Sequence, residues 1–238
     1  MVSGVVSLAK TVAACLSAVR EKIHTLELTY GRAKDSVRLV AVSKQQPVTK
    51  IIEAYHCGQR DFAESYVQEA QEKINALSDY AINWHFIGSI QSNKIKTIAS
   101  SFHWVHSVSS FAIAQKLSKE RSPALLPMNI CIQVNLDREP SKTGVYIDEL
   151  IPLVKETQTL PHLTVRGLMC IPKPCDASRQ YHSFLRLRIL RDEINNRLNC
   201  SLDTLSMGMS SDLEAAINAG STMVRVGEAI FGKRENTA

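Results

Sequence analysis

Lys44 is the residue whose type and position could do chemistry most directly. It follows the mainly apolar run 37–43, and Pro47 then prevents the extended segment from continuing. A lysine at the carboxyl end of a buried parallel strand lies where α/β barrels place their chemistry. Partial burial would lower the pKa of its amine and make it a nucleophile for carbonyl compounds. A surface lysine that merely begins a loop is the alternative at this point.

Two segments near the C-terminus could hold a phosphate group. They contain the residues Gly208, Met209, Ser210, Arg225, Val226 and Gly227. Barrels often bind phosphate at the loops after strands seven and eight, through backbone N–H groups and a helix N-terminus. Simple capping of the next helix by Ser210, Ser211 or Asp212 is the alternative for the first segment. Arg225 stands among apolar residues, where a buried guanidinium would need a partner.

Strands and helices alternate along the sequence from residue 37 onward. We predict strands at 37–44, 60–63, 84–87, 102–106, 128–135, 163–170, 202–206 and 222–226. We predict helices at 5–29, 48–57, 66–77, 92–99, 109–119, 147–157, 177–198 and 212–219. This order predicts an α/β fold, a single (β/α)8 TIM barrel with an extra N-terminal helix that spans 1–238 as one domain. An open doubly wound sheet is the competing architecture, but the sequence has no GxGxxG motif for it.

In such a barrel the residues that follow the strands face one mouth. Besides the two segments above, the polar or flexible residues there are Lys44, Glu64, Ser65, Gly88, Gln91, Asn93, Ser107 and Asn135. His85, His103 and His106 have no carboxylate or cysteine at ligand spacing in the sequence, so we expect structural histidines and no metal site.

Composition excludes several classes of protein. The net charge of +5 over 238 residues is mild and is not gathered in a basic tract, which gives nucleic-acid binding no support. Lys10 interrupts the apolar core that a signal peptide would need, and no stretch has the length of a membrane span. The six cysteines form no CxxC pair, which indicates reduced thiols. We therefore predict a cytoplasmic protein with no membrane association.

A lysine, a phosphate-binding segment and an arginine together describe a site for pyridoxal 5'-phosphate (PLP). The motifs of the sequence support such a PLP site more specifically. With these motifs the sequence resembles the pyridoxal phosphate homeostasis protein family from the first helix to Gly232. The matching motifs are AVSK at 41–44, WHFIG at 84–88, QSNK at 91–94, RGLM at 166–169, LSMGMS at 205–210, EAAI at 214–217 and GSTMVRVG at 220–227.

The resemblance implies the barrel of alanine racemase (PLP fold type III) without its C-terminal β-domain, and PLP held as a Schiff base on Lys44. It also implies that Ser210 and the backbone around Gly227 hold the phosphate and that Arg225 faces the pyridine nitrogen. We add Asn135, Met209 and Val226 to the predicted cofactor-binding residues. Two positions depart from the family pattern, since Ala63 and Ser65 stand where relatives have glycine and asparagine.

We therefore predict a PLP-binding protein of intracellular PLP homeostasis and not an enzyme. An amino-acid racemase and a class I aldolase are the alternatives. A racemase of this barrel type takes its second acid/base from another domain of a partner subunit, and none is expected here because the sequence ends at Ala238. We also expect a monomer, with PLP-dependent apoenzymes as recipients of the cofactor.

Overall fold

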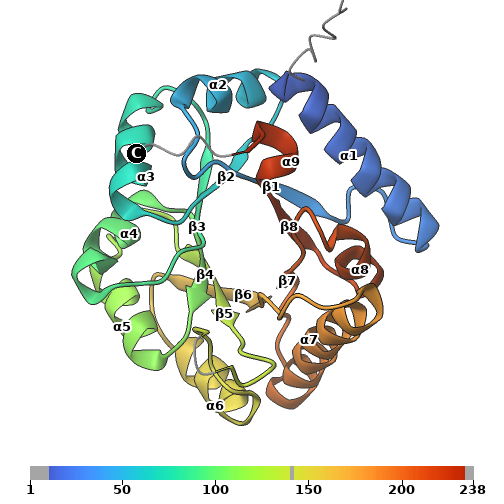
Figure 1. Cartoon of the computed structure of the whole chain (residues 1–238). Coiled ribbons are helices and arrows are strands. Elements are labelled where there is room, and N and C mark those ends of the chain that lie inside the picture. Colours follow the sequence, from blue (N-terminus) through green and yellow to red (C-terminus); the bar gives the residue numbers. More distant parts are fainter. Residues whose placement is uncertain (1–10, 140–141, 234–238) are drawn as a thin grey trace, which may run out of the picture.

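Eight parallel strands close into a barrel in which sequence order and spatial order coincide, from β1 to β8 (Figure 1). The computed structural model describes residues 11–139 and 142–233. The strands are β1 (Arg38–Val42), β2 (Asp61–Glu64), β3 (Asn83–Phe86), β4 (Trp104–Val108), β5 (Met128–Gln133), β6 (Leu163–Met169), β7 (Thr204–Ser206) and β8 (Met223–Val226). Because β1 pairs with β8, the sheet has no open edge, and the doubly wound alternative is wrong.

Helices form an outer ring around the strands (Figure 1). They are α1 (Val12–Thr29), α2 (Val48–His56), α3 (Val67–Ala76), α4 (Ile95–Ser101), α5 (Phe111–Glu120), α6 (Ile147–Thr157), α7 (Ala177–Leu198), α8 (Leu213–Asn218) and α9 (Glu228–Phe231), with a short 3-10 turn η1 (Ser92–Lys94) before α4. All eight predicted strands and all eight predicted helices are present, with ends that differ by a few residues. Helix α9 was not predicted, because a segment this short has too few residues to display a helical period. Turn η1 lies within the helix predicted at 92–99, whose first three residues are 3-10 rather than α-helical.

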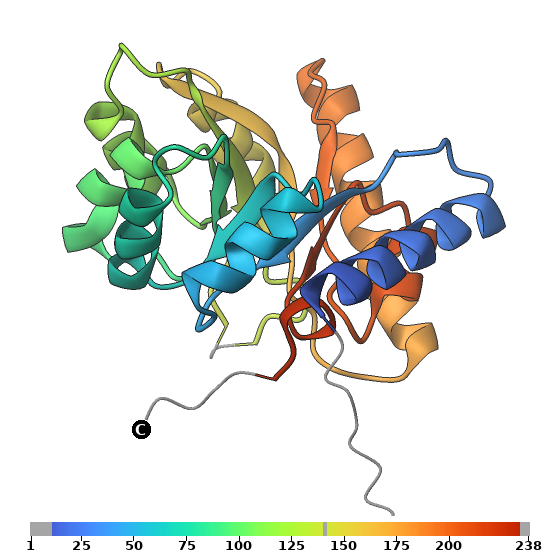
Figure 2. The same cartoon turned by 90° about the horizontal axis from the view of Figure 1, so that it is seen from above.

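The extra helix α1 lies along the outside of the barrel and packs against α2, α8 and α9 (Figure 2). The apolar stripe that predicted this helix is its buried face, from Val12 to Leu26. The side chain of Thr11 caps it by accepting a hydrogen bond from the backbone N–H of Ala14. Gly31 follows with a positive φ of 62°, as expected for a glycine just past a helix end. The part of the prediction before residue 11 lies outside the described residues.

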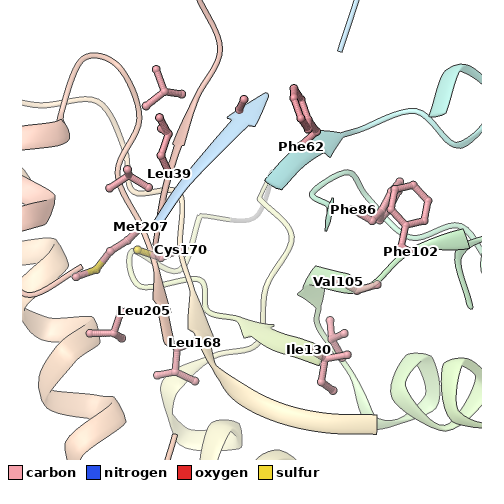
Figure 3. Packing of buried hydrophobic residues seen from close by; sticks show 14 of the residues in the cluster. Leu39, Phe62, Phe86, Phe102, Val105, Ile130, Leu168, Cys170, Leu205 and Met207 are labelled. Carbon is pink, nitrogen blue, oxygen red and sulfur yellow. The ribbon is translucent and has the colours of Figure 1, made fainter. Parts of the chain in front are cut away.

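The core has two separate apolar layers because side chains alternate along each strand. One set points outward to the helices and includes Leu39, Phe62, Phe86 and Leu205 (Figure 3). The other set fills the inside of the barrel, and its buried members are Val40, Ala63, Trp104, Cys131, Met169 and Met223. Polar side chains that point into the barrel therefore lie in the same layer as this second, smaller cluster.

None of the helices in the described part of the chain combines the length and the hydropathy that a membrane span requires. All six cysteines are free thiols, as predicted. Burial raises the pKa of Cys131 and of Cys170 to about 12, so both are protonated and unreactive at neutral pH.

Candidate functional site

A cavity of about 320 Å³ opens at the carboxyl end of the barrel, where β1, β7 and β8 end. Five of the seven predicted cofactor-binding residues line it, namely Lys44, Met209, Ser210, Arg225 and Gly227. Met169 and Ile171 add apolar surface. A partly enclosed cavity with a few convergent polar groups is the usual form of a small-molecule site.

The position of Lys44 is fixed by hydrogen bonds on both sides of it. The backbone N–H of Ser43 continues the sheet by donating to the carbonyl of Ala63 over 3.0 Å. Gln45 adopts a positive φ of 57°, and its backbone N–H donates to Glu69 Oε1 over 2.5 Å. The N–H of Gln46 then closes the turn onto the carbonyl of Ser43. Lys44 therefore leaves the strand from a tightly held turn.

A buried ionic cluster lies behind this turn. Lys73 Nζ donates to Glu64 Oε1 over 2.8 Å, to Glu69 Oε1 over 2.6 Å and to the carbonyl of Ser43 over 2.7 Å. The hydroxyl of Ser43 also donates to Glu64 Oε1. Burial raises the pKa of Glu64, although Lys73 opposes the shift, and its second carboxylate oxygen lacks a hydrogen-bond partner within residues 11–139 and 142–233.

This cluster corrects one expectation from the sequence. We expected both Glu64 and Ser65 to face the mouth of the barrel. Ser65 does line the cavity, whereas Glu64 is fully buried on the outer side of the sheet, against Ser43 and Lys73. The reason is the alternation of side chains along a strand, which sends neighbouring residues to opposite faces.

Arg225 is 4% exposed, and its guanidinium reaches into the barrel from β8. It donates to the hydroxyl of Ser206 over 2.6 Å and to the carbonyl of Cys170 over 3.1 Å. Burial lowers the pKa of Arg225, but a guanidinium remains protonated in proteins. The site thus presents a permanent positive charge that can only donate hydrogen bonds.

The loop after β7 provides the second half of the cavity wall. Gly208 has a positive φ of 100°, and a Cβ there would come within 2.5 Å of Ala216. Asp212, rather than Ser210, occupies the N-cap position of α8, and its Oδ1 accepts the backbone N–H of Met209. Of the three residues in the capping alternative, Asp212 occupies the N-cap position and Ser210 does not. The exposed hydroxyl of Ser210 lies at the cavity instead.

The loop after β8 approaches from the other side. Gly227 lies so close to β1 that a Cβ on it would come within 3.0 Å of the carbonyl of Val42. Helix α9 begins at the next residue. The first N–H groups of a helix have no partner within the helix, so this turn offers donors to an anion.

Two predicted residues do not line this cavity. Val226 is buried in the outer core cluster, so its side chain points away from the cavity. Asn135 lines a neighbouring depression, where its amide nitrogen donates to the carbonyls of Glu139 and Lys142 and its oxygen accepts the N–H of Glu139. The side chain of Asn135 therefore stabilises its own loop through these hydrogen bonds, and its position does not support the predicted cofactor contact.

A second cavity, of about 450 Å³, lies on the other side of Lys44. Gly88, Gln91 and Lys94 line it, and Ser65 is shared between the two cavities. Ser107, which we expected at the mouth, donates its hydroxyl to the carbonyl of Gly88. Lys44 therefore stands between two openings at the same end of the barrel.

The hydrogen-bond partners of the buried histidines were not predicted. His85 Nε2 lies 3.0 Å from Asp61 Oδ1, so this histidine does have a carboxylate partner. Adjacent strands bring the two residues together, since Asp61 begins β2 and His85 lies on β3. Among the described residues no group of three His, Cys, Asp or Glu side chains could hold a metal ion.

Comparison with known proteins agrees with this geometry. Residues 15–235 match the model of the alanine racemase N-terminal domain family. The chain is 47% identical over 226 residues to the pyridoxal phosphate homeostasis protein of Pseudomonas aeruginosa, which covers 94% of this chain and 96% of that protein. It is 42% identical over 224 residues to the protein of the same name from Escherichia coli, which covers 92% and 95% of the two chains.

Solved structures show the same relationship. The structure of PipY of Synechococcus elongatus with PLP bound matches with a TM-score of 0.83 and 34% identity, covering 93% of this chain and all of that one (100%). An alanine racemase of Clostridium difficile matches with a TM-score of 0.72 at 11% identity, covering 93% of this chain and 58% of that one, which is a likeness of fold alone. The chain belongs to the pyridoxal phosphate homeostasis protein family, and its barrel is that of the alanine racemase N-terminal domain.

Proposed function

We propose that this protein binds PLP covalently through Lys44 and takes part in intracellular PLP homeostasis without substantial catalytic turnover. The observation that carries the proposal is the single cavity in which Lys44, Ser210, Arg225 and Gly227 meet. The relatives from Pseudomonas aeruginosa and Escherichia coli bear the name of this function, and PipY has been solved with PLP bound.

The residues present fit the three polar parts of PLP. An amine at Lys44 suits the aldehyde, and a hydroxyl at Ser210 with N–H groups near Gly227 suits the phosphate dianion. Arg225 is a buried donor, which suits the lone pair of an unprotonated pyridine nitrogen. The walls between them are apolar, as Met169 and Ile171 show.

Arg225 is also the reason to propose a binding protein rather than an enzyme. When bound, PLP supplies a ring that can accept electrons from a reacting carbon, most strongly when an acidic residue keeps its nitrogen protonated. A fixed positive charge disfavours that protonation and weakens the ring as an electron acceptor. Neither a racemase nor an aldolase is favoured by any observation at this cavity.

Borohydride trapping tests the proposal. The purified protein is incubated with PLP, reduced with borohydride and digested, and the peptides are mapped by mass spectrometry. We expect a pyridoxyl-phosphate label on Lys44, together with a visible absorbance band that reduction removes. A protein that gains neither band nor label with PLP would refute the proposal. Trapping only with an aldehyde or ketone substrate would indicate the aldolase.

The setting of this function is part of the proposal. We propose that the chain acts in the cytoplasm as a single-domain monomer and that PLP-dependent apoenzymes receive its cofactor. Every residue that the proposed site uses comes from one chain, so PLP binding as proposed requires no partner subunit. Light scattering on a sizing column measures the molar mass and thereby tests whether the protein is a monomer. Transfer of the cofactor is tested by the reactivation of a PLP-dependent apoenzyme in the presence of a PLP scavenger. Reactivation by the PLP-loaded protein is compared with reactivation by an equal amount of free PLP.

A further inference from the structure

Four hydrogen bonds in a row cross the interior of the barrel from Arg225 to Asp61. Arg225 donates to Ser206 Oγ over 2.6 Å, and Ser206 Oγ lies 2.7 Å from His106 Nδ1. His106 Nε2 lies 2.9 Å from His85 Nδ1, and His85 Nε2 lies 3.0 Å from Asp61 Oδ1. This row of hydrogen bonds begins at the cavity and ends at the opposite rim of the barrel, where β2 starts. We call these five residues the interior relay.

The chemistry of the two ends determines the direction of every proton in the relay. Arg225 can only donate, so the oxygen of Ser206 accepts from it, and an ionised Asp61 at the other end can only accept, so with neutral histidines the Ser206 hydroxyl donates to His106 Nδ1. His106 must then carry its proton on Nε2 and donate it to His85 Nδ1. His85 in turn carries its proton on Nε2 and donates it to Asp61. Both histidines are thereby fixed in one neutral tautomer.

The electrostatics of the relay agree with this assignment. Burial lowers the pKa of His106 well below its usual value, and His85 and Arg225 add to that shift. Burial also lowers the pKa of His85, although Asp61 opposes it. Burial would raise the pKa of Asp61, but the hydrogen bond from His85 and the charge of Arg38 outweigh it and hold the pKa below its usual value. At neutral pH the histidines are neutral and Asp61 is ionised.

We infer that Asp61 orients Arg225 from the far end of the barrel, with His85, His106 and Ser206 as positioning residues for the guanidinium. An ionised carboxylate can only accept, and this requirement passes through two imidazoles to the Ser206 hydroxyl. The hydroxyl then turns its lone pair toward Arg225. The same principle operates where a buried aspartate fixes the tautomer of a catalytic histidine. The inference rests on the proposed function only in that Arg225 is taken to face the cofactor.

The histidine tautomers can be read directly, without any cofactor, by 15N NMR of the imidazole nitrogens. We expect His85 and His106 of the native protein both to carry their proton on Nε2 alone at neutral pH. Asp61→Asn replaces the obligate acceptor by an amide that can also donate, so the single tautomer should give way to a mixture. A proton on Nδ1 of either histidine in the native protein would overturn the relay.

Asp203 provides the matched control for this variant. It lies at the same rim just before β7 and pairs with Arg166 over 2.5 Å, outside the relay. Asp203→Asn should leave the tautomers of His85 and His106 as they are in the native protein. An unchanged single tautomer in Asp61→Asn would show that Asp61 does not set the direction. If that variant does not fold, the native spectrum alone still decides the inference.

PLP binding gives the second readout. Ser206→Ala removes one of the two acceptors of Arg225 and should weaken PLP affinity about tenfold, the size expected for one hydrogen bond to a charged group. His106→Leu should weaken it similarly. His106→Gln, whose amide keeps one acceptor and one donor, should recover most of the loss. Equal affinities in His106→Leu and His106→Gln would mean that the relay only fills space.

The two readouts separate the possible failures. Absence of PLP binding in the native protein, with both histidines in the expected tautomer, would refute the proposed function and leave the relay intact. Normal labelling of Lys44 by PLP, with the wrong tautomers, would refute the relay alone.

Discussion

Lys44 and Arg225 line one cavity although they lie near opposite ends of the sequence. Lys44 follows β1 and Arg225 lies on β8, and these two strands pair with each other in the closed barrel, where Val40 is opposite Arg225. The pairing that closes the barrel therefore also sets the position of the amine relative to the guanidinium. Formation of this site requires the complete fold.

Replacement of Lys44 should separate covalent from non-covalent binding. In Lys44→Ala the visible band and the borohydride label should disappear, while PLP still binds through its phosphate and ring. Equilibrium dialysis measures the remaining affinity. Lys94→Ala is the control, because Lys94 lines only the neighbouring cavity and should leave the label in place. A labelled Lys44→Ala protein would contradict the assignment.

The phosphate should supply much of the affinity. Pyridoxal, which lacks it, should bind about a hundredfold more weakly than PLP, since two charge-assisted hydrogen bonds of about 1.5 kcal/mol each would be lost. Titration of both compounds, followed by absorbance, gives the ratio. Comparable affinities would remove the loops at Ser210 and Gly227 from the site.

The protein loaded with PLP should exchange the α-proton of amino acids only at a negligible rate. The positive charge of Arg225 weakens the ring as an electron acceptor, and the carbon acid is therefore poorly activated. Incubation with L- and D-alanine in deuterated water, followed by proton NMR, measures the exchange. Rapid exchange of either enantiomer would favour the racemase.

The buried ionic cluster should make a variant's stability depend on pH. Lys73→Met leaves Glu64 buried without its cation and should lower the free energy of unfolding by about 3 kcal/mol at pH 7. The folded-state pKa of Glu64 is already raised by burial, and loss of Lys73 raises it further. Between the unfolded and folded pKa values the folded state binds more protons, so stability falls as pH rises through that window.

The loss in Lys73→Met should therefore be greatest at neutral pH and shrink as the pH falls toward the usual pKa of a glutamate. Urea unfolding at several pH values measures this dependence. Lys155→Met, on the exposed surface of α6, is the control and should cost little at any pH. A loss that is independent of pH would show that the cost comes from packing rather than from the charge of Glu64.

Gly167 should tolerate no larger side chain. A Cβ on it would lie 1.8 Å from the carbonyl oxygen of Thr204 on the neighbouring strand, and no rotamer can relieve a clash with backbone. Gly167→Ala should destabilise the protein by about 3 kcal/mol in urea unfolding. At Gly31 a Cβ would have no neighbour within 4 Å, although φ is 62°. Gly31→Ala should therefore lower the free energy of unfolding by only about 1 kcal/mol.

Much of this protein could be predicted from the sequence because the relevant signals are local. Alternating strands and helices predicted the barrel, and the helical stripe from Val12 to Leu26 predicted the outer helix α1. Lys44 at the end of an apolar run and glycines beside a serine and an arginine predicted the loops that line the cavity. Each of these features depends on residues that are close together in the chain.

The tertiary structure alone decided which face each polar side chain occupies and which distant residue it meets. One position along a strand separates Ser65 at the cavity from Glu64 in the outer layer. Asp61 reaches His85 only because β2 and β3 are neighbours with a fixed register. Such pairings depend on the closure and register of the sheet, which bring together residues that no spacing in the sequence relates.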